Sequence, residues 1–154
     1  MPLDLCYKVF YSILEKICRL KFKRIIIISA HGPGFHQFVK EACKEIARKF
    51  EVKILYVHVW ELITKEELVE LTQDKFIHGA CAETSLILYL RPELVKLERV
   101  KEEGLKEILK GYRVYPYKRE KYYKGNPRLA SKEIGEKLFK LLVKRTLEVI
   151  ESSL

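Results

Sequence analysis

The sequence predicts an α/β protein with parallel strands, and three consecutive stretches carry this prediction. Arg24–Ser29 is a continuous isoleucine run, which is typical of a central strand buried on both faces. Residues 35–50 have apolar side chains at helical spacing, and residues 52–60 form a second apolar run of strand length. A strand, a helix and a strand in this order indicate a right-handed βαβ crossover, so we expect the two strands to be parallel.

Further helices are expected on both sides of this crossover. Apolar residues at three- and four-residue spacing predict helices over residues 3–20, 65–72, 82–90 and 131–152. Ser131 is the expected N-cap of the last helix, because its hydroxyl can accept a backbone N–H of the first turn. No linker, repeat or low-complexity tract interrupts the chain, so residues 1–154 are expected to form a single domain with one core.

The composition is that of an ordinary folded protein, with 48% hydrophobic and 33% charged residues. No apolar run is long enough to span a bilayer, so no membrane contact is expected. The four cysteines are scattered without a CxxC pair, which favours a reducing cytoplasm over a disulfide scaffold or zinc ribbon. Three of them, Cys6, Cys18 and Cys43, follow helical apolar patterns and are expected to be small buried hydrophobes.

The net charge of +9 permits attraction to nucleic acid or to anionic substrates. Along the helices the basic residues alternate with acidic ones, which is more typical of a solvated surface. Residues 112–124 differ, because five tyrosines there alternate with lysines and arginines, a mixture that suits base stacking and phosphate contact. A partly buried loop is the plainer interpretation of this stretch.

The first candidate for chemistry is His31, which directly follows the predicted strand Arg24–Ser29 and precedes Gly32, Pro33 and Gly34. This position presents an imidazole at the edge of the sheet, where it could ligate zinc or act as a base. A histidine that only turns the chain is the structural alternative. The glycines are not a phosphate-binding loop, because neither a GK[ST] nor a GxGxxG spacing is present.

The second candidate is the stretch from His78 through Cys81 and Glu83 to Thr84 and Ser85, at the expected start of a helix. Helix N-termini favour anions, so Cys81 could have a lowered pKa and bind metal or react. Glu83 could instead only offset the helix dipole, and the hydroxyls of Thr84 and Ser85 could be capping groups.

Taken together, these segments resemble those of the creatininase (creatinine amidohydrolase-like) family. Its members have an Asn-Gly-His-Gly-Gly-Asn-like loop after a buried strand, matched here by residues 29–34. They have a His-Ala-Gly-Glu-x-Glu-Thr-Ser-like segment that leads into a helix, matched by residues 78–85. Their last helix opens with a Gly-x-Pro-x-x-Ala-Ser-x-x-x-Gly segment, matched by Gly125, Pro127, Ala130, Ser131 and Gly135.

The resemblance implies a three-layer α/β/α fold with a mostly parallel sheet. It also implies a metal-dependent amidohydrolase of cyclic amide or formamide C–N bonds, with a binuclear zinc, iron or manganese site. His31 matches the family's ligand histidine, and His78 and Glu83 match catalytic positions. Cys81 stands where most members have a ligand glutamate, so His31 and Cys81 form at most half of a metal site.

Several ligands of the family lie on an earlier segment resembling Glu-x-His-Gly-x-His-Leu-Pro, whose counterpart would precede Leu3. The resemblance is therefore to a domain that is partial relative to the family and lacks its N-terminal strand region. Pro33 stands where some members supply a carboxylate, and it cannot ligate.

Three functions follow from this pattern. The first is a degenerate homologue that is inactive alone. The second is one subunit of a split hydrolase whose missing ligands come from another polypeptide. The third, for which the sequence gives the least support, is a basic nucleic-acid-binding module that uses residues 112–124. The missing strand region would leave an edge or apolar surface exposed, so a homo-oligomer is also expected.

Overall fold

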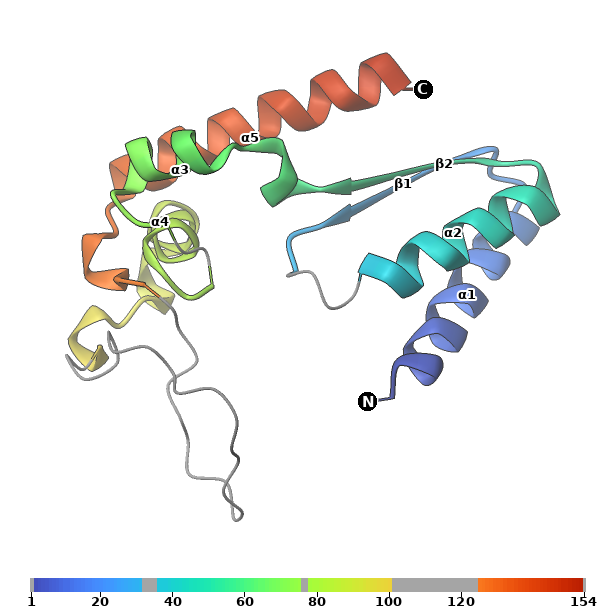
Figure 1. The fold of residues 1–154 in the computed structure, drawn as a ribbon, viewed down its shortest axis with the longest axis horizontal. Helices are drawn as coiled ribbons and strands as arrows, with labels where there is room; N and C mark the ends of the chain where they lie inside the picture. Colours follow the sequence, from blue (N-terminus) through green and yellow to red (C-terminus); the bar gives the residue numbers. More distant parts are fainter. Residues whose placement is uncertain (1, 32–35, 76–77, 101–124, 154) are drawn as a thin grey trace, which may run out of the picture. The chain divides into compact units, whose positions relative to one another are not determined.

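The computed structural model describes residues 2–31, 36–75, 78–100 and 125–153 (Figure 1). The α-helices and strands are, in order, α1 (Leu3–Arg19), β1 (Arg24–Ser29), α2 (His36–Phe50), β2 (Lys53–His58), α3 (Lys65–Thr72), α4 (Cys81–Leu90) and α5 (Lys132–Ser153). Short 3₁₀ turns follow β2 (η2, Val59–Leu62) and precede α5 (η6, Pro127–Leu129). The predicted helices and strands are thus present, and the α/β class is confirmed. In the described ranges, no helix is both long and apolar enough to cross a membrane.

The chain divides into two compact units, which are treated one at a time below. The first unit consists of residues 1–62 and 144–154, and the second of residues 63–143. The expectation that residues 1–154 form one domain stays a prediction.

In the first unit, β1 and β2 form a parallel pair in which Arg24 lies opposite Lys53 and Ser29 lies opposite His58. The crossover helix α2 connects them, as the sequence predicts for a βαβ unit. Because the strands are parallel and of equal length, both end at the same edge, where the chain continues into the His31 loop and into η2.

The core of this unit lies between the sheet and the helix pair α1 and α2, which run side by side (Figure 1). The buried side chains of this core are Leu14, Cys18, Ile25, Val39, Ala42, Cys43, Ile46 and Val52. Cys6 is buried on α1 as well, so the prediction of three small buried cysteines is confirmed. Burial raises the pKa of the Cys43 thiol to about 11, which keeps it protonated and inert at neutral pH.

One prediction about β1 is wrong, because the strand is not buried on both faces. Ile25 is buried and Ile27 half-buried, whereas Ile26 and Ile28 are exposed. The reason is that α1 and α2 pack against the Ile25 face, and successive side chains of a strand point to opposite faces. An isoleucine run alone does not distinguish a strand covered on one face from a strand covered on both.

Polar contacts fix the rim between α1 and α2. The Tyr7 hydroxyl donates to the Glu45 carboxylate, which raises the pKa of Tyr7 to about 12. The Lys49 ammonium donates to the Glu15 carboxylate at 2.9 Å and to the Tyr11 hydroxyl at 3.1 Å. Since these side chains are largely exposed, they orient the helices more than they stabilise them.

In the second unit, the first turn of α5 approaches α4 closely. The Ser131 hydroxyl accepts the backbone N–H of Ile134 at 3.2 Å, which confirms the predicted N-cap. The Ser131 N–H in turn donates to the Ser85 hydroxyl at 3.2 Å. One turn later, a β-carbon added to Gly135 would lie 1.9 Å from the Ser85 carbonyl oxygen, so only glycine allows this approach.

This contact predicts that Gly135→Ala destabilises the chain, although alanine is the better helix former at an exposed position. The added methyl group must displace the α4 backbone, and overpacking of this kind costs about 1–3 kcal/mol. Urea unfolding monitored by circular dichroism measures the loss. Lys137→Ala, an exposed change on the same helix, is the control and should shift stability by less than about 0.5 kcal/mol. If the two variants were equally stable, α4 and α5 would be able to move apart without any loss in the free energy of unfolding.

Candidate functional site

The loop after β1 is held by side chains that follow β2. The His58 Nε2 lies 2.6 Å from the carbonyl oxygen of His31, so this ring nitrogen carries the proton and donates it. The Trp60 Nε1–H donates to the carbonyl oxygen of Ala30 at 3.1 Å. Both rings are buried, and such hydrogen bonds hold the start of the His31 loop in one conformation at the carboxyl edge of the sheet.

His31 itself is exposed, and its backbone N–H donates to the Ser29 hydroxyl at 3.3 Å. Its neighbours Gly32, Pro33 and Gly34 lie outside the described residues, and the role of His31 as a ligand or base stays a prediction. Sequence reasoning missed His58 and Trp60 as the residues that position this loop. A signal was available in the sequence, since a histidine at the end of a predicted buried strand needs a hydrogen-bond partner for its ring.

In the second unit, His78, Cys81 and Glu83 gather around the first turn of α4. His78 is exposed just before the helix. The Glu83 carboxylate accepts the backbone N–H of Gly79 at 2.5 Å, which fixes the turn that leads into the helix. Gly79 adopts a φ of 59°, a left-handed conformation that costs glycine nothing. Glu83 therefore has a structural role as an N-terminal capping group, and its catalytic role stays a prediction.

Cys81 begins α4 but does not have the lowered pKa that its place at a helix N-terminus suggests. Its side chain is 0% exposed, and its sulfur lies 3.7 Å from the Ser85 hydroxyl oxygen. Burial raises the pKa of the thiol, and the hydrogen bond with Ser85 only partly offsets that shift. The expectation of a lowered pKa is wrong because loss of hydration, the largest cause of the shift, raises the pKa at this position.

Asp74 is a second residue that sequence reasoning missed. Its buried carboxylate accepts the backbone N–H of Asn126 at 2.6 Å, across 52 residues of chain. Gly125 makes this approach possible, because its φ is 93° and a β-carbon there would lie 2.4 Å from the carboxylate. Asp74 therefore ties the segment before α5 to the segment before α4. No local sequence signal identifies a partner so far along the chain.

The described residues do not have the chemistry of a resident metal site. Among the described ranges, no three His, Cys, Asp or Glu side chains gather as a metal site. A thiol ligates as the thiolate, whereas Cys81 is buried with a raised pKa. His31 and His78 are both exposed, and they belong to different units. Residues 112–124, the proposed nucleic-acid-binding loop, lie outside the described part of the chain.

Residues 1–150 match the family model Creatininase, described as creatinine amidohydrolase. The fold is similar to that of a Glu-to-Gln variant of creatininase complexed with creatine, with a TM-score of 0.80 and 21% identity over 99% of this chain and 65% of that chain. A Trp-to-Phe variant of creatininase gives a TM-score of 0.78 at 20% identity, again over 99% and 65%. A creatinine amidohydrolase (creatininase) gives 0.74 at 20% identity over 99% and 64%. No curated protein sequence matches.

These likenesses confirm the creatininase-like α/β fold of the described chain. The chain spans 65% of the length of the first two solved creatininases, so a third of each has no counterpart in these 154 residues.

Burial of all four cysteines predicts that a thiol reagent such as dithionitrobenzoate finds no fast-reacting group in the native chain. In guanidinium chloride all four thiols should react at once, and Cys81→Ser should remove one of them without changing the native trace. A fast native thiol that disappears in Cys81→Ser would show that Cys81 is accessible as a thiolate.

Proposed function

The chain belongs to the creatininase family, and from this premise we propose that its 154 residues are a degenerate homologue that does not hydrolyse C–N bonds by itself. The family's members are metal-dependent hydrolases of cyclic amides and formamides, so activity would require a complete set of metal ligands. We further propose a single, partial creatininase-like domain that works in the cytoplasm and acts by binding a partner.

The state of Cys81 carries this proposal. The resemblance to the family implies that Cys81 stands at the position of a ligand glutamate, which in a working centre would be charged and would reach the metal. Here the side chain is fully buried, contacts Ser85 and has a raised pKa. A position that holds metal in the family has thus become part of the packing between residues of α4.

The remaining candidate positions also do not make up a working metal centre. His31 and Cys81 would supply two of the four ligands that zinc requires. The Cys81 thiol would also have to lose its proton and become accessible. His78 and Glu83 keep catalytic positions of the family, but Glu83 already accepts the Gly79 N–H. We therefore derive no reaction step through zinc, iron or manganese for this chain alone.

The alternative is one subunit of a split creatininase-like hydrolase. The observation that favours it is the coverage of 65% of the solved creatininases, since a second polypeptide could supply the remaining third with its ligands. A homo-oligomer is the expected assembly in either case, and the exposed Ile26 and Ile28 on β1 are an available apolar surface for it.

Metal analysis tests the main proposal. We expect the purified chain, after incubation with zinc, iron or manganese and gel filtration, to retain no stoichiometric metal and to leave creatinine and simple formamides intact. Metal that is retained by the chain and lost in Cys81→Ala would contradict the proposal. Cys43→Ala is the matched control, because it removes a buried cysteine from the other unit and separates ligand loss from destabilisation.

The split-enzyme alternative predicts that activity returns when a second polypeptide is present. A neighbouring reading frame should encode the Glu-x-His-Gly-x-His-Leu-Pro-like segment, and its product mixed with this chain and manganese should hydrolyse an amide substrate. His78→Asn should abolish that activity and Lys137→Ala should preserve it. The alternative fails if the mixture is inactive, or if His78→Asn leaves its activity unchanged.

A further inference from the structure

Helix α1 has more apolar surface than the core of its unit covers. One side packs against α2 and the sheet through Leu14 and Cys18. A second row of apolar residues, Leu5, Val9 and Ile13, recurs at four-residue spacing on another side. These three side chains are 44%, 47% and 52% exposed. An apolar row of this length on an exposed helix face is the pattern of an amphipathic contact surface.

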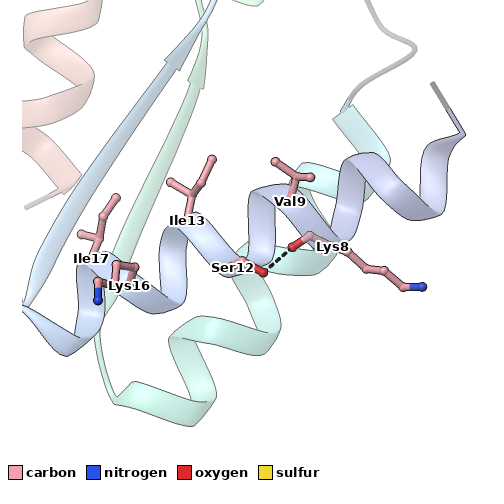
Figure 2. A pocket seen from close by; sticks show the side chains of 6 residues that line it. All are labelled: Lys8, Val9, Ser12, Ile13, Lys16 and Ile17. Carbon is pink, nitrogen blue, oxygen red and sulfur yellow. Dashed lines mark hydrogen bonds between the residues drawn. The ribbon is translucent and has the colours of Figure 1, made fainter.

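This row lies along a shallow groove lined by Lys8, Val9, Ser12, Ile13, Lys16 and Ile17. Figure 2 shows the side chains of Val9, Ile13 and Ile17 projecting to the same side of α1. Ser12 adds little polarity to the groove, because its hydroxyl donates to the Lys8 carbonyl oxygen at 2.7 Å (Figure 2). The groove therefore has an apolar floor.

Among the residues that the structure describes, the positive charge of the groove is only weakly offset. Lys16 lies eleven residues after Leu5, about three helical turns, so its ammonium shares the face of the apolar row. The second lysine, Lys8, reaches only Asp4, at 4.0 Å and with both side chains 72% exposed. The other acid of α1, Glu15, is paired with Lys49 at 2.9 Å and with Arg19 at 3.3 Å.

We propose that the groove lined by Val9, Ile13, Lys8 and Lys16, together with the neighbouring Leu5, binds an amphipathic helical segment of another polypeptide whose apolar face is bordered by carboxylates. Its apolar side chains would cover the exposed row, and its carboxylates would lie beside the two ammonium groups. This inference deepens the proposed partner-dependent function by naming the surface and the chemistry of the partner.

Two other occupants fit the groove less well. A second copy of the chain would bring its own Lys8 and Lys16 into the same contact, where like charges oppose association. Asp4, which lies 4.0 Å from Lys8, would offset this repulsion only weakly. A bilayer surface would attract the lysines, but a helix that buried Leu5 and Val9 in lipid would also bury the Lys16 ammonium of the same face. A carboxylate on a partner helix can neutralise that ammonium directly.

The test uses the full chain and a synthetic, fluorescently labelled helical peptide with a leucine row bordered by glutamates. A second peptide replaces those glutamates by lysines, and a third keeps the glutamates but replaces the leucines by glutamines. Fluorescence anisotropy should show that the first peptide binds at least roughly tenfold more tightly than either of the others. Equal affinity for the first two peptides, or no binding of the first, would overturn the proposal.

Two double variants locate the binding on α1. Val9→Gln with Ile13→Gln, and Lys8→Glu with Lys16→Glu, should each weaken binding of the acidic peptide by roughly tenfold or more. The matched control is Lys40→Glu with Arg48→Glu, which reverses two exposed bases at the same eight-residue spacing on α2 and should leave binding unchanged. If the control variant weakened binding as much as the Lys8 and Lys16 variant does, the effect would come from net charge alone. That result would overturn the proposal.

Further measurements on the same variants exclude the other occupants. Sedimentation that shows a dimer lost in the Val9 and Ile13 variant would assign the groove to a second copy. Co-sedimentation with phosphatidylserine vesicles, lost in the same variant, would assign it to a lipid surface. A lowered melting temperature of that variant would show that the row belongs to the chain's own core. Each of these outcomes overturns the proposal, and none depends on metal or on hydrolysis.

Discussion

The parallel pairing of β1 with β2 is the constraint on which the first unit depends. Its register places Ser29 opposite His58, so the chain leaves both strands at one edge. Only in that register do the rings of His58 and Trp60 reach the carbonyl oxygens of His31 and Ala30. A shift by one residue would turn His58 to the other face and release the loop. The placement of His31 therefore depends on the pairing of the two strands.

The sequence predicts most of this architecture because the information is local. Strand and helix boundaries follow from side-chain periodicity, and the cap at Ser131 follows from a hydroxyl at a helix start. Predictions fail where a distant part of the chain decides the outcome. The isoleucine run of β1 does not reveal that Ile26 and Ile28 stay uncovered, and nothing near Asp74 indicates that its carboxylate binds the Asn126 N–H.

The site is predicted less well than the fold, for a related reason. Residue type and motif position identify His31, His78, Cys81 and Glu83, but chemical state depends on burial. At Cys81 the position at a helix N-terminus suggests a lower thiol pKa, whereas burial raises the pKa. The balance of the two effects requires the packing around the helix start.

The first turn of α4 shows that residues of a motif can have structural roles. Glu83 accepts the Gly79 N–H, and Ser85 accepts the Ser131 N–H, so two polar residues of the motif serve structural hydrogen bonds. Such bonds need neither a metal nor a substrate, and each contributes about 1 kcal/mol. Residues of a family motif can therefore persist for stability alone.

The tie between Asp74 and Asn126 has a consequence for how this family can diversify. The buried carboxylate and the glycine constrain each other, because a β-carbon at position 125 would lie 2.4 Å from the Asp74 carboxylate. A larger residue at position 125 therefore requires this carboxylate to move away. We expect the two positions to change together or not at all among relatives that share this turn.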